Sequence, residues 1–200
     1  YDNQYILSKS DKSKEIYDIL IFARRDIKYA MIPSFIKVIY SSAFDNCYNV
    51  KTINFLNDSQ LQLIGADSFA YSSLERILIP VHVVEIQAEA FIECESLKRV
   101  DFADNAELKI IGESAFTGSS LECLQVPINV ELIEYGALVG CKKLVIVEIN
   151  EKSKLKELNN YSFDDETNLR IMIPAGMFIQ FINNEKTIDD WIILSKKKVK

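Results

Sequence analysis

The feature that most constrains this chain is a motif that returns every 47 residues. All four prolines keep this spacing, and so do three of the four cysteines: Pro33, Pro80, Pro127, Pro174, Cys47, Cys94 and Cys141. A fixed period of this length is typical of a solenoid, in which each unit buries its apolar face only by stacking on its neighbours. The period therefore predicts one elongated repeat domain of stacked coils.

Each period holds two units of unequal length. A large apolar residue preceded by a small one recurs at alternating spacings of 25 and 22 residues, at Phe44, Phe69, Phe91, Phe116, Leu138 and Phe163. Units of this length lie in the range of leucine-rich repeats. We expect the phenylalanine row, the row of alanines or serines before it, and the cysteine row to stack inside the coils.

The two units differ in how the chain leaves their strand. In one, the strand ends at a proline, as in 77–80, because proline cannot donate a ladder hydrogen bond. In the other, a longer polar loop leads to an apolar pair that ends at Ile64, Ile111 or Leu158. The residues that come next tolerate positive φ, which predicts a sharp turn at Gly65, Gly112 and Asn159.

Each strand alternates, so Ile77 and Ile79 are predicted to point inward while Arg76 and Leu78 point outward. Seven such strands about 4.8 Å apart would form one parallel sheet roughly 30 Å long. Its outward residues should form adjacent rows: Tyr29 and Met31, Thr52 and Asn54, Arg76 and Leu78, Arg99 and Asp101, Cys123 and Gln125, Ile146 and Glu148, Arg170 and Met172.

The ends of a solenoid need caps, because a bare end exposes core and strand edge. Residues 5–7 and 19–22 are expected to form the first cap around a loop, with Phe22 in the place 47 residues before Phe69. Residues 175–182 are predicted to form a short helix, and 191–194 a final plug. The resulting division is 1–22 as N-terminal cap and first partial repeat, 23–174 as repeats, and 175–200 as C-terminal cap and basic tail.

The repeat resembles the BspA-like leucine-rich repeats of bacterial surface adhesins and protist protein families. The resemblance rests on a motif that recurs in register, with Ile79-Pro80, Ala90-Phe91 and Cys94 at its fixed points, and it covers roughly residues 15 to 194. The ending Ile173-Pro174-Ala175-Gly176 with a downstream Trp191 is similar to the terminal cap of that family. The resemblance implies a curved right-handed solenoid with one parallel sheet face, little regular helix, no catalysis, and a role in adhesion or protein recognition.

Charge and composition disfavour some classes of binding partner and bear on where the chain is found. The formal charge of −6 disfavours nonspecific binding to nucleic acid or anionic lipid. No apolar run approaches the length of a membrane span, and the first residues lack the basic and apolar regions of a signal peptide, so neither is expected in this chain. Localisation is left open between cell surface, which the family resemblance suggests, and cytoplasm.

Residues for chemistry are sparse. His82 is the only histidine, and Phe35 and Asn129 occupy its equivalent positions in other repeats. Nucleophilic and metal sites need a positioned base or several converging ligands, which this sequence cannot assemble. There is no glycine-rich phosphate loop. We therefore expect neither catalysis nor a cofactor or metal.

The cysteines and two sequons complete the candidates for modification. The three cysteines of the row would lie about 10 Å apart, too far for a disulfide, and are predicted to be buried thiols. Cys123 replaces an outward arginine and is expected to be a half-exposed thiol that could bridge two molecules. The sequons at Asn57 and Asn160 would matter only in a secreted protein.

The first functional hypothesis is a module that binds another protein, such as a host or matrix protein, on the outward sheet face. Its predicted contact residues are Arg76, Leu78, Arg99, Asp101, Cys123, Gln125, Ile146, Glu148, Arg170 and Met172. An alternative is an intracellular scaffold that binds the protein phosphatase 1 catalytic subunit, since Lys98 to Phe102 resembles the RVxF docking motif through Arg99, Val100 and Phe102. Both Val100 and Phe102 are inward strand residues, however, and extracting them would cost about 3 to 6 kcal/mol. Self-association is a third possibility.

Overall fold

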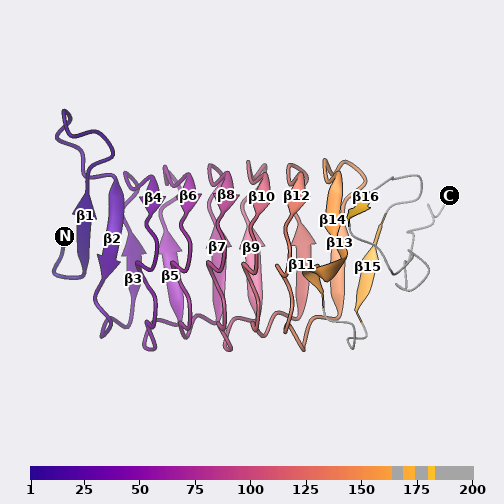
Figure 1. Cartoon of the computed structure of the whole chain (residues 1–200). Coiled ribbons are helices and arrows are strands. Elements are labelled where there is room, and N and C mark those ends of the chain that lie inside the picture. Colours follow the sequence, from indigo (N-terminus) through magenta and orange to yellow (C-terminus); the bar gives the residue numbers. More distant parts are fainter. Residues whose placement is uncertain (164–168, 174–179, 183–200) are drawn as a thin grey trace.

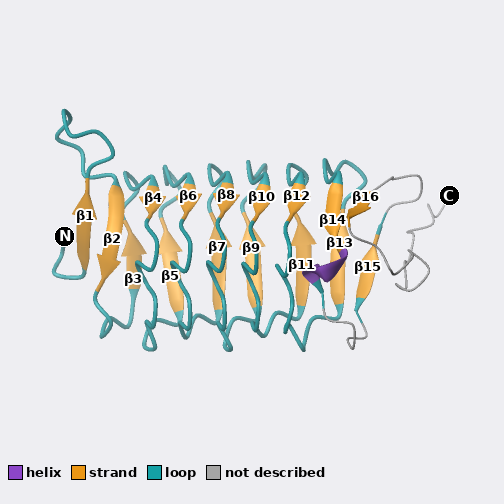
Figure 2. Cartoon of the chain, viewed as in Figure 1, coloured by secondary structure: helices purple, strands orange, loops and turns teal. Residues whose placement is uncertain are grey.

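The repeats stack as successive coils of a β-solenoid, which confirms the predicted fold class. The computed structural model describes residues 1–163, 169–173 and 180–182. Figure 1 shows the strands side by side along the molecule, in two rows that follow the order of the sequence. Among the described residues, the one helical element is a single 3-10 turn, η1 (Asn160–Ser162) (Figure 2).

The strands predicted for the outward face are all present, but they form two sheets instead of the expected single one. The two parallel sheets have the orders β3-β5-β7-β9 and β11-β13-β15. Between the two sheets, the amide of Glu122 donates to the Lys98 carbonyl at 3.3 Å. Among the described residues, no further ladder hydrogen bonds join β9 to β11. The strands are β3 (Ala30–Ile32), β5 (Thr52–Phe55), β7 (Arg76–Ile79), β9 (Arg99–Phe102), β11 (Cys123–Val126), β13 (Ile146–Ile149) and β15 (Arg170–Met172).

The apolar pairs form a second, continuous row of strands that the sequence did not predict as a sheet. This nine-stranded sheet is parallel from β2 onward, whereas β1 pairs antiparallel with β2. Most of its strands have two residues, too few for alternation to reveal them. The strands are β1 (Tyr5–Ser8), β2 (Ile19–Ala23), β4 (Val38–Ile39), β6 (Leu63–Ile64), β8 (Glu85–Ile86), β10 (Ile110–Ile111), β12 (Leu132–Ile133), β14 (Glu157–Asn159) and β16 (Gln180–Ile182).

The turns supply a third row of main-chain hydrogen bonds between coils. The amides of Ser42, Phe44 and Asn46 donate to carbonyls of the next coil at 2.7 to 3.0 Å. The same pattern repeats from coil to coil as far as the bond from Leu138 to Ser162. Neighbouring coils are therefore bonded along three sides, except that a single bond, from Glu122 to Lys98, is described on the sheet face between β9 and β11. Most backbone polar groups next to the core thereby gain a partner.

A stack of aromatic rings fills the core, as the spacing predicted. Neighbouring rings from Phe44 to Phe116 lie nearly parallel, with centroids 5.0 to 5.2 Å apart. Phe22 does not extend this stack, because Leu20 and Ala23 are the inward residues of β2 and Phe22 is 37% exposed beneath the Arg25 guanidinium. Tyr5 instead packs edge-on against Phe44.

The expected helix over 175–182 is wrong for its last three residues. Gln180–Ile182 forms β16, which pairs in parallel with β14 and aligns Phe181 with Leu158. That step of 23 residues continues the apolar row through Ile133 and Leu158, so the period does not end at Pro174. The strand satisfies the open edge of β14. Residues 175–179 and the predicted plug at 191–194 lie outside the described residues.

The glycines that follow the apolar pairs are needed for the close packing of adjacent coils and not for a left-handed turn. Positive φ occurs two residues later, at Asp67 and Ser114, while Asn159 ends β14. A Cβ on Gly65 would lie 2.7 Å from the Ile39 carbonyl oxygen of the preceding coil, and Gly112 has the same surroundings at 2.8 Å. Glycine is required because the backbones of adjacent coils approach each other there.

Replacement of Gly65 should distinguish these two explanations. We expect Gly65→Ala to lower the free energy of unfolding by about 1 to 3 kcal/mol, because the added methyl group meets backbone atoms. Asparagine tolerates positive φ, so Gly65→Asn would be the milder change if a left-handed turn were the requirement. Urea denaturation should instead show Gly65→Asn to be at least as destabilising as Gly65→Ala. Stability close to wild type for either variant would contradict the packing explanation.

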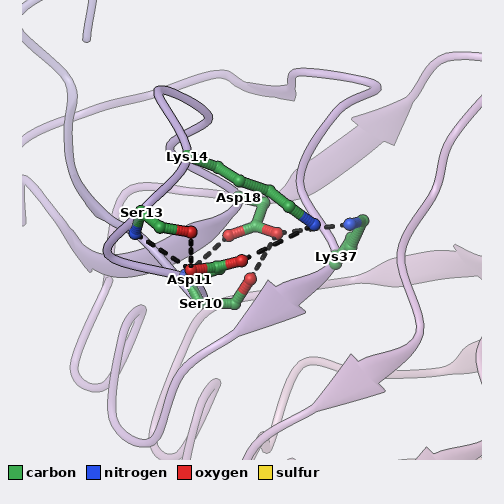
Figure 3. A network of polar contacts seen from close by, with 6 residues as sticks. All are labelled: Ser10, Asp11, Ser13, Lys14, Asp18 and Lys37. Carbon is green, nitrogen blue, oxygen red and sulfur yellow. Dashed lines mark hydrogen bonds and ion pairs between the residues drawn. The ribbon is translucent and has the colours of Figure 1, made fainter.

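A buried carboxylate fastens the loop between β1 and β2 to the first coil (Figure 3). Asp18 accepts hydrogen bonds from the Ser10 hydroxyl at 2.7 Å and the Ser10 amide at 2.8 Å, and Lys37 Nζ lies 3.3 Å from the same carboxylate. The Asp18 carbonyl also accepts from the amides of Lys37 and Val38. The hydrogen bond from the Ser10 side chain is the main reason why the pKa of Asp18 falls from 3.8 to about 2.

This depressed pKa predicts a pH-dependent contribution to stability. The ionised Asp18 stabilises the fold at pH values above its ordinary pKa, and that contribution is lost as pH falls from about 4 to about 2. We expect Asp18→Asn to cost about 1.5 to 3 kcal/mol near pH 7, the range for hydrogen bonds to charged groups. Denaturation curves should show the gap to wild type closing between pH 4 and pH 2. Asp58→Asn, at an exposed aspartate in the loop after β5, is the control, and a gap independent of pH at Asp18→Asn would refute this role.

Candidate functional site

The structure places the predicted contact residues on one surface, which we call the sheet face: the outward side chains of β3, β5, β7, β9, β11, β13 and β15. The alternation is as predicted in β7, where Arg76 and Leu78 are exposed and Ile77 and Ile79 are buried. The predicted contact residues are exposed at Arg76, Leu78, Arg99, Cys123, Gln125 and Arg170, and half-buried at Asp101, Ile146, Glu148 and Met172. Geometry thus brings all ten to one face, and their role in binding stays a prediction.

The N-terminal half of the sheet face carries large exposed apolar side chains. Tyr29 is 77% exposed, Met31 51% and Leu78 53%. Met31 and Leu78 flank Asn54, since Met31 pairs with Asn54 and β5 pairs with β7 in register. Arg76 lies two residues before Leu78 on β7, in the neighbouring row of outward side chains. Tyrosine, methionine and arginine are residue types enriched at protein interfaces.

The C-terminal half of the sheet face is more polar, and hydrogen bonds join several of its side chains. Arg99 Nε donates to Asp101 Oδ1 at 2.7 Å, and this hydrogen bond raises the pKa of the guanidinium. Gln125 Nε2 donates to Glu148 Oε2 at 2.9 Å, which links β11 to β13. These hydrogen bonds fix the orientation of the polar groups on this half of the face.

A hollow of about 660 Å³ opens where the two sheets of the face meet. Its walls come from outward and inward residues of β9, β11, β13 and β15 and from the loops that come after β9, β11 and β13. We call it the β9–β11 hollow. It is lined by Arg99, Val100, Asp101, Phe102, Ala103, Asp104, Asn105, Ala106, Cys123, Gln125, Val126, Pro127, Ile128, Glu148, Ile149, Asn150, Met172 and Ile173. The volume lies within the usual range of ligand-binding pockets.

Sequence reasoning missed the loop residues of this hollow. The period located the strands and their outward positions, but the interruption of the ladder at β9 and β11 has no repeat signal. Asp104, Asn105 and Ile128 therefore looked like ordinary loop residues. The one local irregularity was Cys123 in a position where other repeats have arginine, and it lies in the hollow.

The cysteines lie as predicted, three buried and one exposed. Cys94 Sγ donates to the Phe69 carbonyl at 3.0 Å and lies 3.4 Å from the Ser72 hydroxyl. Burial is the main reason why the pKa of Cys94 rises to about 11. Cys123 is thus the accessible thiol among the four.

Reactive groups are not assembled in the part of the chain that the structure describes. His82 Nδ1 lies 3.4 Å from Glu107 Oε1 in an exposed pair, without a nucleophile beside it among the described contacts. Within the same residues, no three histidine, cysteine, aspartate or glutamate side chains are grouped to hold a metal ion.

The RVxF-like segment is built into β9. Val100 is 5% exposed and pairs in register with Ile77, while Phe102 is half-buried against the core. Docking through these two side chains would require removing the strand from its sheet. The phosphatase hypothesis has no support from this geometry.

Comparison with known proteins identifies the family to which the chain belongs. The chain matches the BspA type leucine rich repeat region in six copies, over residues 14–145 and 62–185. The chain belongs to this family of leucine-rich repeat proteins. Leucine-rich repeats are a general protein-interaction module, and the family is typically non-catalytic. A search of curated proteins found no match.

Solved structures show the same fold. A leucine-rich repeat protein of T. pallidum is 25% identical with a TM-score of 0.70, and the match covers 84% of this chain and 77% of that one. A leucine-rich repeat protein from Bacteroides ovatus is 22% identical with a TM-score of 0.63, and the chain spans about half of its length, 85% against 51%. Neither the family nor these structures point to phosphatase binding. Across the described residues, no helix has the length and apolar character that crossing a membrane needs.

Proposed function

We propose that this chain is a non-catalytic recognition module that binds another protein through its sheet face. The observation that carries the proposal is the set of exposed side chains at the N-terminal half of the sheet face. Tyr29 precedes β3, Met31 lies on β3, and Leu78 and Arg76 lie on β7, with β5 between the two strands. Tyrosine, methionine and arginine are enriched at protein interfaces, and tyrosine and arginine in their hot spots. Membership of a leucine-rich repeat family supports the same conclusion.

The architecture favours a protein partner over a small molecule. Seven strands present their outward residues in rows, so contacts can extend over several coils. Repeat proteins use such extended surfaces for binding, because each repeat adds a few side chains to one continuous face. Surface adhesion is the setting that the family resemblance suggests, and it belongs to this proposal.

Peptide selection tests the role of the sheet face without a known partner. Peptides from a random phage-displayed library would be selected on the immobilised chain, and their affinities measured for wild type and for single variants. Leu78→Glu and Gln125→Arg alter the two halves of the face. Tyr40→Glu is the matched control, since Tyr40 follows β4 in the nine-stranded sheet and is 55% exposed, close to the 53% of Leu78.

We expect most selected peptides to lose at least tenfold in affinity in one of the two face variants and to keep it in Tyr40→Glu. Glutamate in place of Leu78 leaves a charge desolvated within an apolar contact, which accounts for a loss of this size. Arginine in place of Gln125 removes the hydrogen bond to Glu148 and changes the size and charge of the surface that a peptide meets in the other half. Thermal unfolding would establish that the variants are folded. Selected peptides that bind both face variants normally, or that lose binding to Tyr40→Glu, would refute the proposal.

A further inference from the structure

We infer that the four-stranded sheet β3-β5-β7-β9 binds an acidic segment of a partner protein, with a carboxylate on Arg76 and an apolar side chain on Leu78. The inference rests on the proposed function, because this sheet is part of the sheet face, and it names the chemistry of the partner. The surface concerned, which we call the basic patch, consists of the charged side chains on this sheet and just before its strands: Lys28, Lys51, Glu75, Arg76, Lys98, Arg99 and Asp101.

The basic patch has the opposite charge to the chain as a whole. It carries five exposed cationic side chains and two carboxylates, and a third carboxylate, Glu122, lies at its border before β11. Arg24 and Asp26, which come before Lys28, form an ion pair with each other. The whole chain has a formal charge of −6. The positive excess of the patch therefore complements an anionic partner.

Three cations of the patch share one carboxylate. Lys51 Nζ lies 2.8 Å from Glu75 Oε1, and this hydrogen bond is the main reason why the pKa of Glu75 is lowered. The charges of Lys98 and Arg76 lower the pKa of Glu75 further. Among the described residues, the Arg76 side chain has neither a hydrogen bond nor an ion pair of its own. Its guanidinium is therefore available to a carboxylate from outside.

Two arginines stand side by side in the patch. Arg76 pairs in register with Arg99 on the neighbouring strand, so their Cα atoms lie about 4.8 Å apart. Arg99 donates to Asp101 at 2.7 Å, whereas Leu78 occupies the position of Asp101 on β7. Like charges directly opposite each other on a sheet are destabilising. A carboxylate on Arg76 would offset that repulsion, and a guanidinium can hold it through two parallel hydrogen bonds.

The apolar neighbours of Arg76 decide between classes of anion. Leu78 is 53% exposed two residues further along β7, and Met31 is 51% exposed on β3. A protein segment with an aliphatic side chain beside its carboxylate would remove this apolar surface from water. A nucleic acid backbone brings phosphates without aliphatic side chains, and the charge of the whole chain disfavours a polyanion. An acidic and apolar protein segment therefore suits the patch better than nucleic acid does.

A lysine of the nine-stranded sheet provides the matched control. Lys98 directly precedes β9 in the basic patch, Lys109 directly precedes β10 in the nine-stranded sheet, and both are exposed. Lys98→Gln and Lys109→Gln thus change the net charge equally and differ in the face that loses it. Arg76→Gln and Leu78→Ser test the two contacts that the inference names.

The test uses a rhodamine-labelled synthetic peptide in which three glutamates alternate with two leucines between terminal glycines. Fluorescence anisotropy at physiological salt should show saturable binding to the wild-type chain, with affinity at least fivefold weaker for Arg76→Gln and at least threefold weaker for Lys98→Gln and Leu78→Ser. Lys109→Gln should stay within twofold of wild type. A peptide with lysine in place of glutamate should bind at least tenfold more weakly. Thermal unfolding would establish that each variant is folded.

Met31 gives an independent readout of position. Saturating peptide should slow its oxidation by hydroxyl radicals at least threefold, as measured by mass spectrometry. Tyr40, which is 55% exposed beside the nine-stranded sheet, should be modified at an unchanged rate. Peptide binding that leaves Met31 unprotected, or that protects both residues equally, would place the peptide elsewhere and overturn the inference.

Other outcomes separate this inference from the function it rests on. No binding of the glutamate peptide, or equal losses in Lys98→Gln and Lys109→Gln, would overturn an acidic segment as the ligand. Single-stranded oligothymidine that bound as tightly as the peptide, and lost affinity in Arg76→Gln, would identify a nucleic-acid site and would also overturn the inference. The sheet face as a recognition surface would still be judged by the library selection, whose peptides need not be acidic.

Discussion

The hydrogen-bond register between successive coils is the constraint on which this structure depends. Main-chain bonds join neighbouring coils at the sheet face, at the nine-stranded sheet and through the turns, where Phe44, Phe69 and Phe91 each donate to the next coil. With the coils held in register, the phenylalanine rings stack at about 5 Å and exclude water from the axis. The same register sets the outward side chains in rows. The proposed recognition surface is thus a consequence of how the backbone repeats.

Much of the fold could be predicted because the repeat encodes it redundantly. Pro80 and Pro127 mark strand ends, Phe91 and Phe116 mark the core, and each appears at a fixed interval. The nine-stranded sheet escaped prediction, since two-residue strands have no alternation to detect. Gly65 was assigned to a left-handed turn because glycine permits both positive φ and close backbone contact, and only the positions of neighbouring coils decide between them.

The candidate site was predicted less completely than the fold. Alternation identified the outward residues Arg76, Leu78 and Gln125, because a strand period of two is local. The β9–β11 hollow depends on where one ladder stops, which is a property of two coils packed together. Nothing in the sequence around Asp104 and Ile128 therefore indicated that they line this hollow. Cys123, which stands where two other repeats have arginine, is a break in the period that falls in this hollow.

Native-state amide hydrogen exchange tests most directly whether inter-coil register holds the molecule together. The amides of Phe69, Phe91 and Phe116 donate across coil boundaries at 2.8, 2.8 and 2.9 Å. We expect all three to exchange slowly and at similar free energies of opening, since breaking one boundary exposes the shared aromatic stack. Exchange of these amides as fast as that of the exposed loop residue Asp104 would contradict this expectation.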